Sequence, residues 1–312
     1  SNNNLDTIEN HKNYTFQKGD IRDHELFDQV INEFAPDSII NFAAESHVDR
    51  SIDGPKVFIE TNILGTYELL NSSLKYFKSL TDNKKGIFKF VHISTDEVYG
   101  SLGKEGKFSE STPYSPSSPY SASKASSDHL VKAWYYTYNL PVVITNCSNN
   151  YGPYQFPEKL IPLIISNCLS NKELPIYGDG LNIRDWIYVD DHCRGVFEVL
   201  CKGKIGETYN IGGNQELTNI ALVNKICDIL DEIKPSKIND SYKNLIIFVK
   251  DRPGHDFRYA IDSTKIKNDL NFTPKETIDK GLRKTIKWYL ENEDWINRIK
   301  MTSYNQERLG KI

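Results

Sequence analysis

The sequence predicts an α/β protein built on a doubly wound parallel sheet, with a smaller C-terminal lobe. Three observations carry this prediction. Strand-like and helical patterns alternate along the first half, the 312 residues suffice for about two domains or one large α/β domain, and 38% hydrophobic with 26% charged residues is typical of a globular chain. The 18 Gly and 13 Pro are scattered. This composition excludes a disordered chain, collagen and a coiled coil.

Strand-like and helical segments follow one another in the first half of the chain. The predicted strands are residues 14–18, 38–43, 87–94 and 141–147. The predicted helices are residues 23–34, 57–80 and 120–138. Strand and helix in repeated order favour a parallel sheet with helices on both faces.

The second half keeps helical patterns but has shorter strands, separated by loops that contain Gly and Pro. Its predicted helices are residues 160–170, 191–201, 219–233 and 274–292. No repeat, low-complexity tract or linker divides the chain. We therefore expect two interleaved parts, residues 1–150 and 151–312.

Charge and apolar patterning exclude several classes of protein. The 38 Lys and Arg against 42 Asp and Glu give 38 − 42 = −4, so we expect no nucleic-acid partner. The longest apolar runs, such as residues 160–165, are far shorter than the ~20 residues that span a bilayer. The first residues do not resemble a secretory signal. We expect no membrane partner and a cytoplasmic protein.

The cysteines form no CxxC pair and share no metal-binding spacing with histidines, so we expect no metal site. Their odd, dispersed count predicts reduced, buried thiols, as in cytosolic proteins. The five are Cys147, Cys168, Cys193, Cys201 and Cys227.

A glycine-rich turn, which a dinucleotide fold needs so that backbone N–H groups approach the pyrophosphate, does not occur in this sequence. Gly212-Gly213 lacks a third glycine. Either the protein binds no dinucleotide, or the turn preceded Ser1. Since the only methionine is Met301, we expect that the natural N-terminus is missing and that the chain as written binds a dinucleotide weakly.

Tyr120 and Lys124 stand four residues apart at the start of a predicted helix, so their side chains share one face. A cation near a phenol lowers its pKa from ~10 by roughly one to three units, toward use as a base. Such a pair also arises by chance on solvated helix faces. Its context is Ser94-Thr95, at the carboxyl end of a predicted strand, where open α/β sheets bind ligands.

Six motifs together resemble the nucleotide-sugar 4,6-dehydratases of the extended short-chain dehydrogenase/reductase family, over about residues 15 to 290. They are NFAAESHVDRS (41–51), STDEVYG (94–100), SPYSASK (118–124), TNCSNNYGPY (145–154), RDW (184–186) and DRPGHD (251–256). The chain departs from the family in lacking the first strand, glycine loop and second strand. It also has Phe257 where an Arg is common.

The resemblance implies a Rossmann-like fold without its first βαβ segment. Residues 1–150 would bind NAD and residues 151–312 would mostly bind a nucleoside-diphosphate glucose. The implied reaction converts dTDP-glucose to its 4-keto-6-deoxy product and water. A homodimer packed through residues 57–80 and 120–138 is also implied.

The resemblance also implies roles for five catalytic residues. Tyr120 would take the 4-hydroxyl proton, Thr95 would hydrogen-bond that oxygen, and Lys124 would hold Tyr120 and the nicotinamide ribose. Glu97 would then remove the C5 proton, and Asp96 would protonate the departing C6 hydroxyl. Adjacent carboxylates also have a plainer interpretation, because they point to opposite faces of an extended strand and are usually solvated in a loop.

Binding residues carried over from the family form two sets. Cofactor contacts are expected, besides Tyr120 and Lys124, at Asp20, Ile21, Phe42, Ala43, Ala44, Ser46, Thr61 and Asn150. Substrate contacts are expected at Ser46, Thr95, Asn149, Lys159, Leu160, Pro175, Ile176, Tyr177, Arg184, Asn219, Arg252 and His255. Arginine suits a diphosphate because guanidinium binds it in a bidentate manner.

Several alternatives stay open at this point. Arg184 could form a structural ion pair with Asp185. UDP-glucose could be the substrate, since one methyl group is worth only about 1–3 kcal/mol in an apolar pocket. A cofactor-free binding subunit would also lack a glycine loop. We interpret the remaining histidines considered, His47, His92, His129 and His192, as structural.

Overall fold

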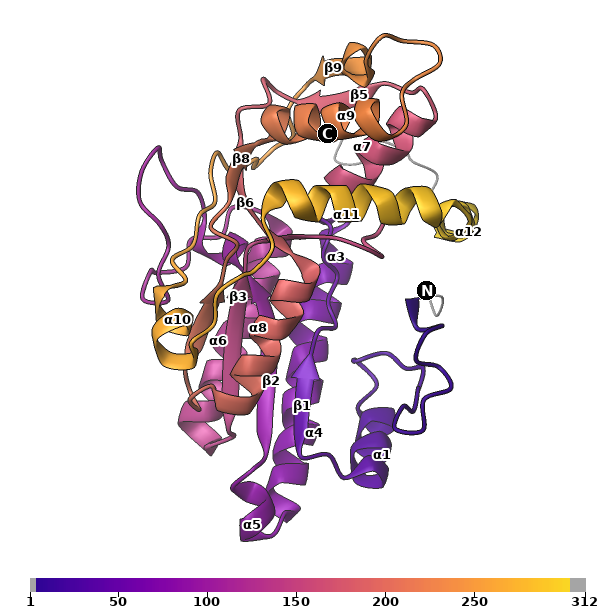
Figure 1. The fold of residues 1–312 in the computed structure, drawn as a ribbon. Helices are drawn as coiled ribbons and strands as arrows, with labels where there is room; N and C mark the ends of the chain where they lie inside the picture. The colour runs from indigo at the N-terminus through magenta and orange to yellow at the C-terminus, as the bar shows by residue number, and fades with distance from the viewer. Residues whose placement is uncertain (1–3, 304–312) are drawn as a thin grey trace.

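A four-stranded parallel sheet forms the centre of the computed structural model, which describes residues 4–303 (Figure 1). Its strand order is β1-β2-β3-β7. The strands are β1 (Ser38–Asn41), β2 (Lys89–Thr95), β3 (Val142–Cys147) and β7 (Thr208–Ile211). The two middle strands are rich in β-branched and aromatic residues and are buried on both faces, as in parallel sheets covered by helices. The predicted parallel α/β sheet is confirmed.

Helices cover both faces of this sheet. On one face α1 (His24–Phe34), α4 (Thr66–Ser79) and α6 (Pro119–Tyr138) pack together over a core that contains Leu70, Phe90 and Val131. On the other face lie α8 (Val189–Lys202) and α10 (Thr264–Leu270). The strands therefore bury side chains in two separate cores, which makes the fold doubly wound.

The second half also builds a lobe at one end of the sheet (Figure 1). Two small sheets, β4-β6-β8 and β5-β9, support it. Their strands are β4 (Asn149–Tyr151), β5 (Leu174–Tyr177), β6 (Ile183–Tyr188), β8 (Glu216–Thr218) and β9 (Ile246–Val249). The helices are α7 (Leu160–Leu169), α9 (Asn219–Ile233) and α11 (Ile278–Glu291).

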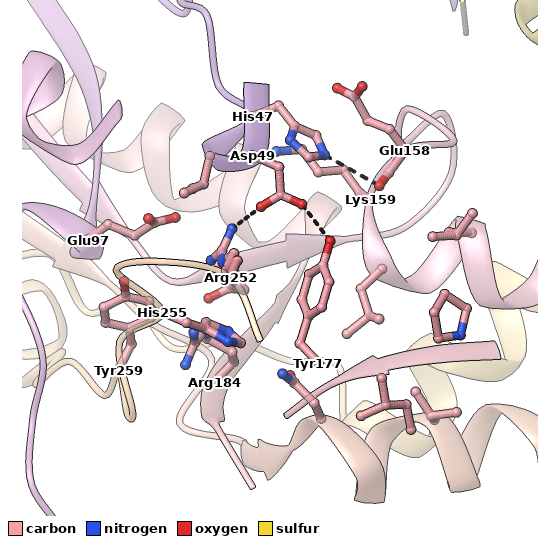
Figure 2. Close-up of a pocket in the computed structure, with 18 of the residues that line it drawn as sticks. His47, Asp49, Glu97, Glu158, Lys159, Tyr177, Arg184, Arg252, His255 and Tyr259 are labelled. Carbon is pink, nitrogen blue, oxygen red and sulfur yellow. Dashed lines mark hydrogen bonds and ion pairs between the residues drawn. The ribbon is translucent and has the colours of Figure 1, made fainter. Parts of the chain in front are cut away.

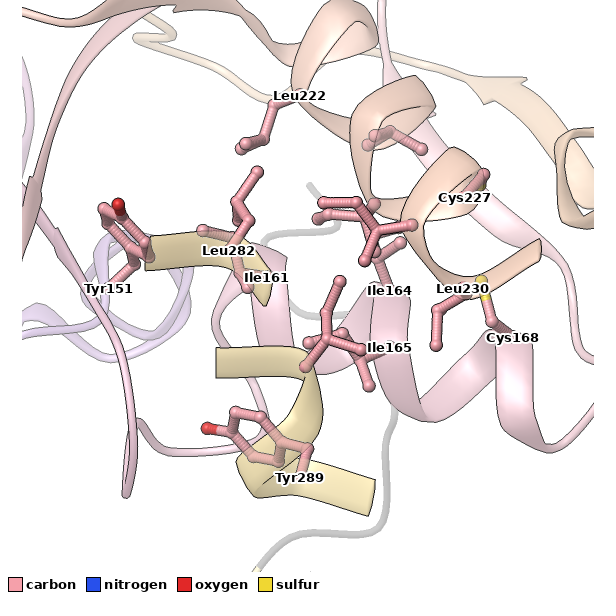
Figure 3. Packing of buried hydrophobic residues seen from close by; sticks show 14 of the residues in the cluster. Tyr151, Ile161, Ile164, Ile165, Cys168, Leu222, Cys227, Leu230, Leu282 and Tyr289 are labelled. Carbon is pink, nitrogen blue, oxygen red and sulfur yellow. The ribbon is translucent and has the colours of Figure 1, made fainter. Parts of the chain in front are cut away.

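Aliphatic side chains from α7, α9 and α11 hold the lobe together (Figure 3). Ile164, Leu230 and Leu282 are fully buried there. Cys168 and Cys227 lie in the same cluster. Burying aliphatic side chains contributes about 1.5–3 kcal/mol each before the entropy of folding is counted, so the lobe has a core of its own.

The predicted helix at residues 57–80 is interrupted. The chain forms α3 (Pro55–Phe58), a π-helical stretch η2 (Ile59–Gly65) and then α4. Gly65 lies against Ile21, and a Cβ added there would meet the Ile21 side chain at 2.6 Å. Stretches of π-helix occur mostly at functional sites. This one includes Thr61, a predicted cofactor contact.

Some predicted elements differ from the structure. Residues 14–18 form no strand, because they pair with no neighbouring strand among the described residues. The helix expected at 274–292 begins only at Ile278, after the capping residue Thr277. The sequence patterns missed the short or terminal elements α2 (Val48–Asp53), α5 (Asp82–Lys85), η3 (Asp96–Tyr99), η4 (Tyr242–Leu245), α10 and α12 (Glu293–Ser303).

All five cysteines are free, as expected, but only Cys168 and Cys227 are buried, while Cys147 is half-buried and two are exposed. Cys193 and Cys201 lie on the exposed face of α8. None of the described helices is long and apolar enough to cross a membrane. Strand β7 comes from the second half of the chain but joins the central sheet, so the division at residue 150 stays a prediction about function.

Candidate active site

Tyr120 and Lys124 lie one turn apart at the start of α6, next to the carboxyl end of β2. A capping box between Ser118 and Ser121 fixes where this helix begins. Both side chains are buried. The Lys124 Nζ donates a 2.8 Å hydrogen bond to the carbonyl of Ile93 on β2, so the lysine connects the helix to the sheet.

A tight turn carries the two adjacent carboxylates. Thr95 ends β2, and its Oγ1 accepts a 3.3 Å hydrogen bond from the Glu97 backbone N–H, which starts the 3₁₀ turn η3. Gly100 ends the turn at φ +88, where a Cβ would lie 2.3 Å from the carbonyl oxygen of Ser115. Asp96 and Glu97 are therefore not on opposite faces of a strand, nor solvated in a loop.

Neighbouring charges separate these two carboxyl groups electrostatically. Burial, followed by the charges of Glu97 and Asp185, raises the pKa of Asp96 well above its usual value. Burial also raises the pKa of Glu97, but Arg252, Arg184 and Lys159 oppose this shift. Of the two, Asp96 is the carboxyl group whose environment favours the protonated form more strongly, and Glu97 is the one whose neighbouring cations favour the anion.

The pKa of Tyr120 differs from our expectation. Burial, and then the charges of Glu97 and Cys147, raise the pKa of this phenol well above its usual value, while a hydrogen bond with Thr95 lowers it. Burial likewise lowers the pKa of Lys124. The prediction that Lys124 brings the Tyr120 pKa toward neutrality is therefore wrong for the protein without ligands, because desolvation dominates.

A cavity of about 210 Å³ opens from Glu97 toward the second lobe (Figure 2). Three basic side chains, Lys159, Arg184 and Arg252, line it. Arg184 is buried, donates to the carbonyls of Ile183 (2.7 Å) and Asp256 (3.0 Å), and lies 4.3 Å above the Tyr259 ring. The alternative of an Arg184–Asp185 ion pair is not seen.

Asp49 organises the cavity from the first half of the chain. Its Oδ1 forms a 2.5 Å ion pair with Arg252, and its Oδ2 accepts a 2.9 Å hydrogen bond from the Tyr177 hydroxyl (Figure 2). Burial disfavours the charge of Arg252, but Asp49 outweighs it and the pKa of Arg252 is raised. The guanidinium keeps its Nε unpartnered and buried, so it has donor capacity left for an anion.

The structure places most of the predicted substrate residues in this one cavity. Ser46 and Thr95 do not line it, although the Ser46 carbonyl accepts a 2.7 Å hydrogen bond from Lys159. The predicted residues that line it are Asn149, Lys159, Leu160, Pro175, Ile176, Tyr177, Arg184, Asn219, Arg252 and His255.

Sequence reasoning missed several lining residues. His47, interpreted as structural, lines the cavity with a buried, unpartnered Nδ1, and burial followed by Lys159 lowers its pKa to about 4. Asp49 lies in the same motif, and both could have been found there. No local pattern marks Glu158 or Tyr259. Also missed were Val48, Leu163, Trp186 and Val223.

A second hollow, of about 390 Å³, lies beside the end of β1. Apolar side chains such as Phe27, Val30 and Leu69 form its walls. Asp20 lies at its edge, where hydrogen bonds from Arg22 lower its pKa to about 2. Four predicted cofactor residues line this hollow, namely Asp20, Ile21, Phe42 and Ala43.

The other predicted cofactor residues lie outside this hollow. Ala44 and Ser46 follow β1, Thr61 lies in η2, and Asn150 lies in β4, with a buried Oδ1 that has no partner. An apolar slot edged by a carboxylate suits a heteroaromatic ring on a hydroxylated sugar, as in a dinucleotide. The residues present therefore fit NAD. No cluster of metal ligands occurs among the described residues.

Comparison with known proteins agrees with this geometry. Residues 1–285 match the family model described as GDP-mannose 4,6 dehydratase. The dTDP-glucose 4,6-dehydratase of Xanthomonas campestris pv. campestris is 53% identical over 308 residues, which cover 99% of this chain and 88% of the relative. An Escherichia coli dTDP-glucose 4,6-dehydratase is 56% identical over 320 residues, with the same coverage.

Solved structures show the same similarity. The dTDP-glucose 4,6-dehydratase of Streptomyces venezuelae, with NAD bound, has a TM-score of 0.87 at 45% identity and covers 96% of this chain and 87% of that one. A UDP-glucose 4-epimerase from Thermotoga maritima has a TM-score of 0.79 at 28% identity, covering 91% and 86%. This chain therefore belongs to the nucleotide-sugar 4,6-dehydratases of the extended short-chain dehydrogenase/reductase family.

Proposed function

We propose that this protein converts dTDP-glucose to dTDP-4-keto-6-deoxyglucose and water, which makes it a lyase. The observation that carries the proposal is the pair of a buried Asp96 and a half-buried Glu97 beside Tyr120, at the mouth of a cavity with three basic side chains. Relatives more than half identical to this chain carry the name dTDP-glucose 4,6-dehydratase. This favours the thymidine nucleotide over UDP-glucose.

The order of the chemical steps follows from the acidity of the sugar hydrogens. The hydrogen at C5 is not acidic until C4 is a ketone, so oxidation at C4 must come before water leaves from C5 and C6. NAD, when bound, supplies the hydride acceptor at C4 and the hydride donor at C6. The protein must therefore provide three proton-transfer groups close together, and the turn after β2 and the start of α6 provide them.

Tyr120 is proposed as the base for the 4-hydroxyl proton, with Thr95 as a hydrogen-bond partner and Lys124 as the nearby cation. Glu97 is the base for C5, because three cations favour its anion. Asp96 is the acid for the leaving C6 hydroxyl, because burial and Glu97 keep it protonated. Two carboxyl groups whose pKa values are pushed apart suit an acid and a base.

The nucleotide diphosphate is proposed to bind at Lys159, Arg184 and Arg252, since guanidinium and ammonium groups pair with phosphate oxygens. The wall formed by Leu160, Leu163 and Pro175–Tyr177 is apolar enough to hold the base. NAD is proposed to bind along the ends of β1 and β2, from the hollow at Asp20 to Tyr120 and Lys124. Cytoplasmic location is part of the same proposal.

A homodimer is also proposed. Apolar side chains on η2, α4 and α6 are exposed at Ile59, Leu64, Tyr67, Tyr136 and Tyr138. Core packing alone does not explain these exposed residues. Sedimentation at micromolar concentration should give a dimer, and Tyr136→Glu should shift it toward monomer. A wild-type protein that sediments only as monomer would contradict this part of the proposal.

The direct test incubates the holoenzyme with dTDP-glucose and, separately, with UDP-glucose, and measures the keto product. We expect product from dTDP-glucose with a higher kcat/KM. A UDP-glucose preference would overturn the substrate assignment. Absence of any keto sugar would favour the cofactor-free binding subunit.

A further inference from the structure

Asp128 is a buried carboxylate on α6, one helical turn beyond Lys124, and the mechanism above does not use it. Its side chain has no solvent exposure, and Lys124 is 4% exposed. Side chains four residues apart lie on the same face of a helix. A negative and a positive side chain are thus buried together next to the catalytic tyrosine.

Neutral donors fix the orientation of this carboxylate. Asp128 Oδ2 accepts hydrogen bonds from Ser94 Oγ at 2.8 Å and from the Tyr114 hydroxyl at 3.0 Å. Tyr114 is itself held by Asn146, whose Nδ2 donates to the same hydroxyl at 3.2 Å. These contacts connect α6 to β2, to β3 and to the loop that precedes the helix.

The other oxygen of Asp128 faces His92, which does not supply a positive charge. Asp128 Oδ1 lies 3.4 Å from His92 Nε2, and His92 Nδ1 lies 3.3 Å from Asn41 Nδ2. Burial, and then Lys124, lower the pKa of His92. The imidazole is therefore neutral at physiological pH and can offer only a polar contact.

Lys124 and Asp128 form no direct ion pair, but they bind adjacent residues of β2, since Lys124 Nζ donates to the Ile93 carbonyl and Asp128 accepts from the Ser94 hydroxyl, so Lys124 is the nearby cation that balances Asp128. A buried charge is costly unless an opposite charge or strong hydrogen bonds compensate it. Burial lowers the pKa of Lys124, and Asp128 is the largest of the contributions that raise it. Lys132 lies one turn further on, half-buried, with its Nζ 5.6 Å from the centre of the Tyr114 ring.

We propose that Asp128 is a positioning residue whose negative charge keeps Lys124 an ammonium group beside Tyr120, where the Ile93 carbonyl orients it. This inference rests on the proposed function, because it assigns the partner of a residue in that mechanism. The titratable groups that interact with the pair are His92, Tyr99, Tyr114 and Cys147. Those on the neighbouring turns of η3 and α6 are Asp96, Glu97, Tyr120 and Lys132.

The test is a titration of Lys124 in the protein without cofactor or substrate. Lysine labelled with ¹³C at Cε gives a resonance for Lys124, assigned as the one lost in Lys124→Arg. In Asp128→Asn this resonance should titrate at lower pH than in the wild type. In Asp128→Glu, which restores the charge, it should return toward the wild-type position. Asp128→Ser is a second neutral variant in case Asp128→Asn does not fold.

Ser94→Ala and Tyr114→Phe are matched controls, since each removes one hydrogen bond to Asp128 but leaves its charge. Both should shift the Lys124 titration less than Asp128→Asn does. In the holoenzyme, Asp128→Asn should lower turnover by roughly tenfold, which is less than the 10²–10⁴-fold effect of losing a general acid or base. The alkaline limb of the pH–rate profile of Asp128→Asn should move to lower pH.

A folded neutral variant whose Lys124 titrates as in the wild type would overturn the proposal and leave Asp128 a purely structural residue. Equal shifts in Asp128→Asn and Ser94→Ala would overturn it too, since the hydrogen bonds rather than the charge would then matter. Failure of the wild-type holoenzyme to make keto sugar would instead contradict the proposed function. The titration would be unaffected by that result.

Discussion

The turn after β2 and the basic cavity bury their ionisable side chains in different ways. In the turn, Asp96 and Glu97 are adjacent, and desolvation raises the pKa of both carboxyl groups. In the cavity, Arg252 is paired with Asp49, 203 residues away in the chain. The carboxyl groups of the turn are neighbours in the sequence and are desolvated. The ion pair of the cavity joins residues that lie far apart in the chain. Proton transfer and anion binding need these different environments.

The largest expected effect comes from removing the Tyr120 hydroxyl, which should abolish the first step, the oxidation at C4. Tyr120→Phe removes the hydroxyl but keeps the ring packed against Phe58. Without the base, turnover in the holoenzyme should fall by at least the 10²–10⁴-fold typical of general acid–base catalysis. Single-turnover absorbance of the reduced cofactor should show no signal after dTDP-glucose is added.

Tyr99→Phe is a matched control, because Tyr99 is also a buried tyrosine but donates to Asn210 instead, at 2.9 Å. It should still give the reduced-cofactor signal. If Tyr120→Phe gave that signal at the wild-type rate, another group would be the base for the 4-hydroxyl.

Variants of the two carboxyl groups should give a different result from Tyr120→Phe in the same measurement. Glu97→Gln and Asp96→Asn should each lower turnover by something like 10²–10⁴-fold, while oxidation at C4 still occurs. Glu97→Gln should also stop the C5 hydrogen from exchanging into solvent deuterium. Asp96→Asn should leave that exchange measurable, since this residue acts on the C6 hydroxyl. Wild-type C5 exchange in Glu97→Gln would show that Glu97 is not the base.

The cavity should respond mainly in substrate binding. Asp49→Asn keeps the shape but removes the charge that orients Arg252, so KM for dTDP-glucose should rise by roughly tenfold, about 1.4 kcal/mol, with a smaller change in kcat. Arg252→Lys should have a similar or larger effect, because a lysine cannot form the bidentate contact. Arg50→Lys is the control, since Arg50 pairs with Glu158 at the cavity edge and is partly exposed.

A fall in kcat with unchanged KM in Asp49→Asn would argue against this division. It would mean that the cavity acts on the chemical step, as the turn does. Equal effects of Arg50→Lys and Arg252→Lys would also remove the special role of the Asp49 pair.

The comparison also explains what could be predicted from the sequence. The parallel sheet was predictable because apolar strands and amphipathic helices alternate. Tyr120 and Lys124 were predictable because helical spacing is a local property. Asp96 and Glu97 were identified by their motif, but their environment was not, since an extended strand predicts opposite faces.

The pairs between residues far apart in the chain could not be predicted from the sequence. Nothing near Asp49 indicates Arg252 or Tyr177, and nothing near Glu158 indicates Arg50. The pKa of Tyr120 was predicted in the wrong direction because the amount of burial cannot be derived from a four-residue spacing. The prediction of a strand at residues 14–18 was wrong because a strand must pair with a neighbouring strand, and the pattern of one segment does not show whether that neighbour exists.

The smallest effect on catalysis, and a test of desolvation outside both regions, is expected at His192 on α8. Burial alone lowers its pKa to about 4, and its Nε2 has no partner. In the unfolded chain the imidazole has a pKa near 6.5 and takes up a proton below that pH, whereas in the folded protein it stays neutral down to about pH 4. The unfolded state therefore binds more protons between these values, and stability falls as pH decreases through this window.

At pH 5 the loss of stability due to His192 should be about 2 kcal/mol relative to pH 8. Urea unfolding of His192→Gln should show a weaker dependence on pH in this range than the wild type. An identical slope in His192→Gln and the wild type would mean that His192 is accessible to protons in the folded state.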